Sequence, residues 1–171
     1  YRPLQSTSNA QALGPGARYE IDATIADIYL VSNSNPESIV GRPTIYFVID
    51  VFSRLVAGFY IGFESPSYLA AIQALNIAMI DKVQYCAEYG ISIQPEDWPA
   101  VGLPDALLAD RGELLGYQIE ALEKTFAVRL ENAPARRGDA KGIVEQAFNT
   151  YQAYFKKEGK GKGVVEGTTV K

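Results

Sequence analysis

Residues 19–25 have the sequence Tyr-Glu-Ile-Asp-Ala-Thr-Ile, which sets a carboxylate in the middle of a β-prone run. Apolar side chains alternate along this run, and a period of two predicts a strand within residues 18–31 whose apolar residues share one face. Asp22 then points to the other face. Carboxylates are rarely buried unless they are paired or bind a metal. Asp22 is therefore either a solvated residue on a polar face or part of a functional site.

Two more acids lie where a globular chain has little structural reason to place a charge. Asp110 closes the apolar run at 103–110, and Glu145 lies within an amphipathic helix. Glu113 is a competing candidate for the role of Asp110. Glu145 is also spaced to form an i,i+4 ion pair with Lys141, worth only ~0.3–0.5 kcal/mol. If the three acids converge, they form the oxygen-ligand site that Mg²⁺ or Mn²⁺ uses in phosphodiester chemistry.

The composition excludes several classes of enzyme. The chain has 171 residues, one cysteine and no histidine. The absence of histidine removes Ser-His-Asp catalysis, Cys-His catalysis and His-ligated zinc. The single Cys86 excludes an internal disulfide and fits a reducing, cytoplasmic compartment. No apolar run approaches the ~20 residues of a membrane span, so no membrane association is expected.

The net charge of −4 argues against a stand-alone nucleic-acid binder, because such domains are usually basic. The chain begins at Tyr1 rather than Met, which suggests a piece of a longer protein. Flanking domains would then supply any affinity for nucleic acid. Without them, the composition describes an ordinary soluble cytosolic domain.

The sequence divides into an extended lead-in over 1–17, one core domain over 18–157 and a flexible basic tail or linker over 158–171. The order of elements in the core, βββ-α-β-α-β-α, predicts an α/β fold with a mixed sheet flanked by helices. The first three strands form a meander, and the fourth is expected to run parallel to the first. Strands are expected at 18–31, 44–49, 55–63, 103–109 and 125–130, and helices at 65–83, 113–124 and 139–157, with an irregular segment at 84–102.

Asp50 also ends a β-prone run, but it has a structural explanation. It heads the turn at 50–54 between two strands, where an aspartate caps the backbone through its own side chain. Asp50 is therefore kept apart from the three candidate acids.

The order of elements and the positions of the acids resemble the RNase H-like fold, and more closely the DDE catalytic core of retroviral integrases and their transposase relatives. The family's three acids correspond here to Asp22, Asp110 and Glu145. The separation 145 − 110 = 35 is close to the family's D,D-35-E pattern. Ile-Asp-Val-Phe-Ser-Arg at 49–54 and Lys-Gly-Ile-Val-Glu at 141–145 support the resemblance. Within the family the sequence is most similar to TnsB-type transposases of target-selective bacterial transposons, and Mu-type transposases share the same core.

The resemblance implies a mixed sheet of five strands, a three-stranded antiparallel meander plus two parallel strands. It also implies a transposase that nicks transposon 3′ ends and joins them to target DNA with two Mg²⁺ ions, for which Mn²⁺ should substitute. Asp22 would bind both ions, and Asp110 and Glu145 would each complete one site. Four cations are candidates for contacts to the DNA backbone, with a solvated surface charge as the alternative for each: Arg111, Arg136, Arg137 and Lys141.

The partners that the resemblance implies are transposon and target DNA, further copies of the chain on that DNA, an endonuclease subunit and an AAA+ regulator, all in the bacterial cytoplasm. Two other functions stay open. One is an RNase H-like, metal-dependent nuclease that hydrolyses DNA without joining it. The other is a non-catalytic assembly module whose acids are vestigial.

Overall fold

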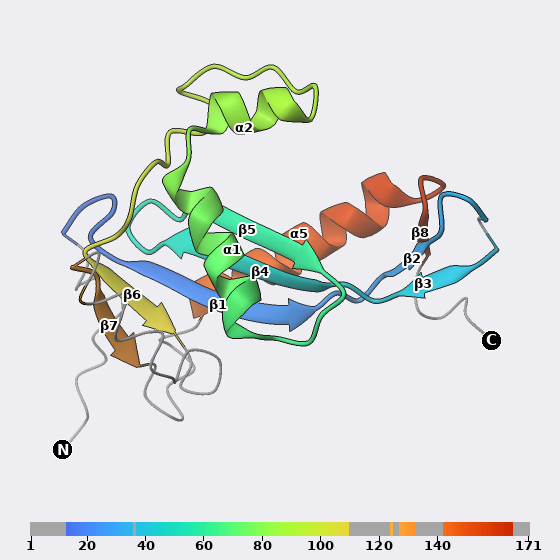
Figure 1. Cartoon of the computed structure of the whole chain (residues 1–171), viewed down its shortest axis with the longest axis horizontal. Helices are drawn as coiled ribbons and strands as arrows, with labels where there is room; N and C mark the ends of the chain where they lie inside the picture. Colours follow the sequence, from blue (N-terminus) through green and yellow to red (C-terminus); the bar gives the residue numbers. More distant parts are fainter. Residues whose placement is uncertain (1–12, 36, 110–123, 125–126, 133–141, 166–171) are drawn as a thin grey trace.

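A mixed five-stranded sheet forms the centre of the computed structural model, which describes residues 13–35, 37–109, 124, 127–132 and 142–165 (Figure 1). Its strands lie in the order β5-β4-β1-β6-β7. β1 pairs antiparallel with β4, and β4 with β5, whereas β6 and β7 extend the sheet in parallel with β1. The predicted meander and the two parallel strands are confirmed. The strands are β1 (Tyr19–Ile25), β4 (Thr44–Asp50), β5 (Val56–Gly62), β6 (Ala106–Ala109) and β7 (Arg129–Asn132).

α1 (Tyr68–Met79) covers one face of the sheet. Ser67 caps its N-terminus, because the Ser67 hydroxyl accepts the N–H of Ala70 at 3.3 Å. The helix lies directly on β5, so that a Cβ atom added to Gly58 would overlap the carbonyl oxygen of Ala74. The helix and the strand can approach so closely only because the side chains between them are small.

The helix predicted at 65–83 is shorter than expected. The helix ends at Met79, whose side chain is 37% exposed, so Val83 belongs to another element. A search for helical periodicity looks for large apolar side chains. The close approach of α1 to β5 instead requires small side chains on the buried face of the helix. The buried residues are Ala70, Ala71, Ala74, Leu75 and Ala78.

α5 (Gly142–Gly159) covers the opposite face of the sheet. Val144 and Phe148 are buried there, as expected of an amphipathic helix. The rings of Phe148 and Phe47 stack with their centroids 5.1 Å apart. Tyr151, three residues after Phe148, is 38% exposed. This face is therefore packed by large aromatic side chains.

A second sheet, in the order β3-β2-β8, was not expected. The predicted single strand at 18–31 is two strands, because the pairing of β1 with β4 stops at Ile25. The structure also differs from the predicted tail at 158–171, since part of that segment pairs with β2. So short a strand is held by main-chain bonds and leaves no side-chain period to detect. The strands are β2 (Tyr29–Val31), β3 (Ile39–Gly41) and β8 (Val164–Val165).

α2 (Lys82–Glu88) projects beyond the edge strand β5 (Figure 1). The sequence predicts irregular structure over 84–102, which is wrong for the part that lies in this helix. The signal was Asp81, whose Oδ1 accepts the N–H of Gln84 at 2.9 Å and so caps the helix.

Lys82 joins α2 to the end of α1. It is 1% exposed. Its ammonium group donates to the carbonyl oxygens of Ala78, Ile80 and Ala100 at 3.3, 3.0 and 2.5 Å. Burial lowers the pKa of Lys82 to about 8, because desolvation disfavours the charged form.

Asp50 caps the β4–β5 turn, as predicted. Its Oδ2 accepts the N–H of Ser53 at 3.0 Å and the hydroxyl of Ser53 at 2.5 Å. Its Oδ1 accepts the N–H of Gly16 at 3.3 Å. The side chain is 3% exposed and is fully engaged in holding the turn.

The helix predicted at 113–124 lies outside the described residues except for Lys124. None of the helices in the described part of the chain is long and apolar enough to cross a lipid bilayer.

Candidate active site

Asp22 lies in the middle of β1 on the face that α5 covers. It stands opposite Phe47 in the antiparallel ladder, and residues in such pairs point to the same face. The Phe47 ring packs against Phe148 and Tyr151 of α5, with centroids 5.1 and 5.0 Å away. Asp22 is half-buried, and its Oδ1 accepts the N–H of Ala23 at 3.0 Å. Its carboxylate is thus held beside a helix in a partly shielded position.

β6 leads the chain to the same part of β1. The two strands are parallel, with Leu108 beside Glu20. β6 ends at Ala109, so its carboxyl end lies beside the segment of β1 that carries Asp22. Asp110 follows Ala109 in the sequence and lies outside the described residues, so its role stays a prediction.

Glu145 occupies the first turn of α5 and is exposed. Gln146 and Thr150 lie on one flank of this helix and line a hollow of about 300 Å³ together with Arg54 of the β4–β5 turn. At 100° per residue, Glu145 lies on the other flank. The strand order puts β1 and β6 on the side of β4 away from β5, so that flank is directed toward the strand of Asp22. Glu145 lies one helical turn before Phe148, whose ring stacks on Phe47, the residue opposite Asp22 in the sheet.

Further charged residues border β1 on this face. Glu20 shares the face with Asp22 and is 1% exposed. Arg18, two residues earlier, forms an ion pair with Glu131 of β7. The sequence analysis did not single out these residues. The alternation along β1 could have placed Arg18 and Glu20 on the same face as Asp22. That Glu131 lies beside Arg18 follows only from the registers of β1, β6 and β7.

The donor set fits a hard divalent cation. Asp22 and Glu145 offer carboxylate oxygens, which Mg²⁺ and Mn²⁺ prefer. Among the residues that the structure describes, no three His, Cys, Asp or Glu side chains come together as a complete metal site. A metal held by Asp22 and Glu145 would need a third protein ligand, and Asp110 is the candidate that the sequence supplies.

The four predicted DNA-contacting cations, Arg111, Arg136, Arg137 and Lys141, all lie outside the described residues. Their roles also stay predictions.

The fold has a counterpart among solved structures. One chain of the cryoEM structure of the simian T-cell lymphotropic virus intasome in complex with PP2A regulatory subunit B56 gamma matches with a TM-score of 0.58. The match has 14% sequence identity and covers 88% of this chain and 43% of that one. At this identity the likeness concerns the fold alone, and the predicted RNase H-like fold is confirmed.

The family is decided by the sequence. The profile of the TnsB C-terminal domain matches residues 20–161. The chain belongs to the TnsB C-terminal domain family. The matched part of this TnsB-type chain contains Asp22, Asp110 and Glu145, and the resemblance stated from the sequence is confirmed.

Two relatives of this TnsB C-terminal domain are much longer proteins. Transposon Tn7 transposition protein TnsB of Escherichia coli is 62% identical over 170 residues, which are 99% of this chain and 24% of that protein. The transposase for transposon Tn552 of Staphylococcus aureus is 22% identical over 142 residues, which are 82% of this chain and 27% of that protein. The chain thus spans about a quarter of the length of either relative.

Proposed function

We propose that the chain is the catalytic core of a DNA transposase, a metal-dependent enzyme that nicks transposon 3′ ends and joins them to target DNA. The observation that supports the proposal is the placement of Asp22 on the face of β1 that α5 covers, with Glu145 in the first turn of α5 and β6 ending one residue before Asp110. The names of the two relatives, a transposition protein and a transposase, support it.

In this proposal Asp22 serves both Mg²⁺ ions, while Asp110 and Glu145 each complete one site, and Mn²⁺ can replace Mg²⁺. When bound, the ions supply activation of the attacking oxygen and stabilisation of the leaving oxygen. Three carboxylates and one phosphate balance two divalent cations in charge, which accounts for chemistry without histidine. The chain's own task is to hold the carboxylates in position. β1 does so as a strand paired on both sides, and α5 does so through the Phe47–Phe148 packing.

DNA is the proposed substrate, and Arg111, Arg136, Arg137 and Lys141 are the proposed contacts to its backbone. Because the chain carries a net charge of −4, most of the affinity has to come from other parts of the assembly. The proposal also includes the partners that the family resemblance implies, which are further copies of the chain on DNA, an endonuclease subunit and an AAA+ regulator. The proposed location of the assembly is the bacterial cytoplasm.

A crystal soaked in Mn²⁺ and measured by anomalous scattering tests the metal site. We expect a peak among Asp22, Asp110 and Glu145, and no peak in crystals of the Asp22→Asn variant. Three ordered carboxylates lying far apart would remove the chemical basis of the proposal. Carboxylates that are close together but hold no ion would mean that DNA supplies the remaining ligands.

Joining and hydrolysis are separated by a chimera in which this chain replaces the matching segment of Tn7 TnsB, a replacement favoured by the 62% identity. Labelled DNA with a free transposon 3′-hydroxyl end is offered together with target DNA. We expect a joined product. Cleavage without joining would indicate a nuclease, and neither product together with no Mn²⁺ binding would indicate an assembly module.

A further inference from the structure

The outer edge of β5 is bordered by two apolar hollows, one on each face of the sheet. β5 is an edge strand whose only sheet partner among the described residues is β4. The hollow on the α1 side has a volume of about 670 Å³, and the hollow on the α5 side has a volume of about 540 Å³. Phe59, Ile61 and Trp98 line both, so the two hollows form one surface around the strand, here named the β5-edge groove.

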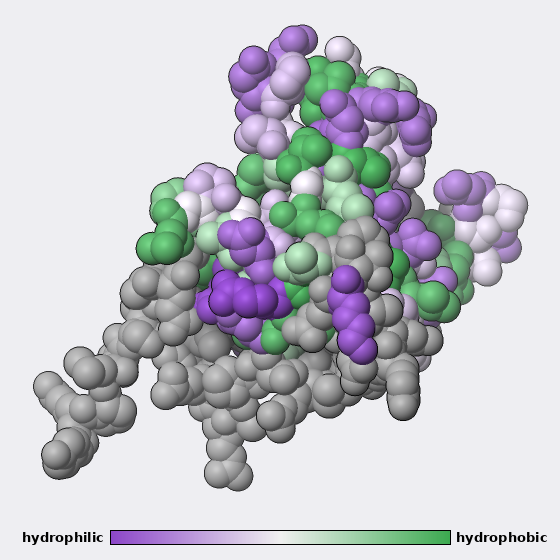
Figure 2. All heavy atoms as spheres, turned by 60° about the vertical axis from the view of Figure 1, so that its left-hand side comes forward, coloured by the Kyte–Doolittle hydropathy of each residue, from purple (hydrophilic) through white to green (hydrophobic). Residues whose placement is uncertain are grey.

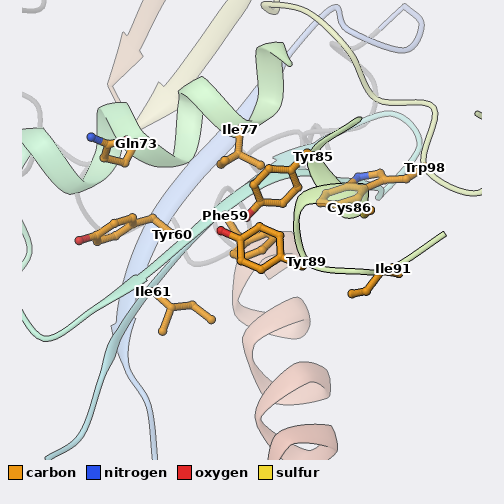
Figure 3. A pocket seen from close by; sticks show the side chains of 10 residues that line it. All are labelled: Phe59, Tyr60, Ile61, Gln73, Ile77, Tyr85, Cys86, Tyr89, Ile91 and Trp98. Carbon is orange, nitrogen blue, oxygen red and sulfur yellow. The ribbon is translucent and has the colours of Figure 1, made fainter. Parts of the chain in front are cut away.

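The walls of the β5-edge groove come from three elements. Figure 3 shows the α1 side, where Ile77 of α1, Tyr85 of α2 and Tyr89 directly after α2 surround the side chains of β5. Tyr151 and Tyr154 of α5 line the other side. Much of this surface meets water, since Tyr89 is 67% exposed and Tyr154 is 59% exposed. Exposed apolar surface of this size is typical of an interaction site.

The second half of the strand inside the groove reaches the surface, since residues 59–62 are half-buried or exposed whereas Ala57 and Gly58 are buried. Trp98 donates its ring N–H to the carbonyl oxygen of Val56 at 2.6 Å, so the first residue of β5 is covered. Further along, Ile61 is 45% exposed on the edge. Edge strands offer main-chain N–H and C=O groups to another chain unless a protein protects them with charge or proline. β5 contains neither a charged residue nor a proline.

The projecting segment that forms one wall of the groove is acidic. In the projecting segment 81–98 the exposed charges are Asp81, Glu88, Glu96 and Asp97, and the single cation, Lys82, is buried. α1 contributes no charged residue. Figure 2 shows hydrophilic side chains over the outer parts of the projection and hydrophobic ones where it meets the body. This charge favours a basic protein segment and disfavours the DNA backbone.

We propose that the β5-edge groove binds an extended, basic-apolar peptide segment of a protein partner, which adds a strand to β5. Successive side chains of a strand point to opposite faces, so hollows on both faces accept adjacent apolar residues, flanked by Lys or Arg. Main-chain pairing supplies affinity, and the hollows and the acidic projecting segment supply specificity. The groove contains none of the candidate catalytic acids, so its test is independent of the proposed transposase activity.

The peptide Ac-Lys-Arg-Val-Ile-Val-Arg-Lys-NH₂ is a suitable probe. Trp98 is the only tryptophan in the chain and lines both hollows, so its fluorescence reports binding directly. We expect a saturable fluorescence change with the 171-residue chain. Methylation of the central main-chain nitrogens should weaken binding at least tenfold, because it removes pairing to β5. Exchange of the basic residues for Glu and Asp should weaken it by a similar factor.

Ile61→Lys should also weaken binding at least tenfold. The matched control is Val40→Lys, since Val40 is an exposed strand residue of the other sheet. Glu88→Lys and Glu96→Lys together should weaken binding without altering the groove walls, which covers the case that Ile61→Lys disturbs folding. Binding that ignores N-methylation or Ile61→Lys would overturn the proposal, as would no binding at millimolar peptide. A dimer of the chain that Ile61→Lys dissociates, detected by sedimentation, would assign the groove to a second copy instead.

Discussion

The two faces of the five-stranded sheet are packed in opposite ways. Under α1 the contact is made by alanines and by Gly58, so helix and strand approach backbone to backbone. Under α5 the contact is made by rings such as Phe47 and Phe148, and the acids Glu20 and Asp22 point to this side. Large rings keep the helix at a distance and leave room for carboxylates beside them. The α1 face therefore serves stability, and the α5 face is free to carry chemistry.

The comparison predicts the largest loss of activity for a substitution on the α5 face. Asp22→Asn keeps the shape of the side chain and removes its charge. We expect a loss of at least ~10³-fold in strand transfer by the Tn7 TnsB chimera, equivalent to about 4 kcal/mol of barrier, with little change in the free energy of unfolding. Glu37→Gln, at an exposed loop position far along the chain from the three acids, is the control and should stay within a few-fold of the parent. Substantial joining by Asp22→Asn would remove Asp22 from the site.

The α1 face should respond in the opposite sense. Gly58→Ala adds a methyl group against the backbone of Ala74, and we expect a loss of about 2 kcal/mol in the free energy of unfolding by urea. Gly14→Ala, where an added Cβ meets nothing within 4 Å, should cost far less. Equal costs would mean that α1 can move away from β5 freely.

A change in pH is expected to alter the free energy of unfolding by an intermediate amount. The pKa of Lys82 falls from 10.5 to about 8 in the folded chain, so between these values only the unfolded chain holds the proton. The free energy of unfolding should therefore rise from about pH 8 to pH 10.5, because stability increases with pH wherever the unfolded state binds more protons. Lys82→Met should lack this rise in urea unfolding measured across the same pH range. A parallel pH profile in both proteins would assign the effect to other groups.

The smallest effect concerns the entry to α1. Ser67→Ala removes the acceptor for the Ala70 N–H and should cost about 1 kcal/mol of unfolding free energy. Ser34→Ala, in an exposed loop, is a fitting comparison. If both variants unfold at the same urea concentration, the cap contributes nothing measurable.

The central sheet could be predicted because its signals are local. The alternation at 19–25 gave β1 and the side to which Asp22 points, and the turn residues at 50–54 gave the hairpin capped by Asp50. The position of Glu145 followed from helical periodicity alone. In each case a few neighbouring residues contain the whole pattern.

Apart from α2, whose cap Asp81 is a local signal, the missed features depend on contacts between distant parts of the chain. β8 pairs with β2 across more than a hundred residues, and neither strand has a side-chain pattern of its own. The alanine face of α1 makes sense only beside Gly58. The β5-edge groove likewise lies between α2, β5 and α5, so it cannot be predicted from any single segment of the sequence.

The anchoring of α5 has a consequence for mechanical tolerance. Near the far end of the helix, Gln152 accepts the N–H of Asp27 at 2.8 Å, and Lys156 reaches the Asp27 carboxylate at 2.6 Å. Asp27 lies just after β1, so the helix that carries Glu145 is fastened to the strand that carries Asp22. A slide of the helix by one residue, about 1.5 Å, would break both contacts. The contacts that fix the position of α5 along β1 therefore lie in the half of the helix farthest from Glu145.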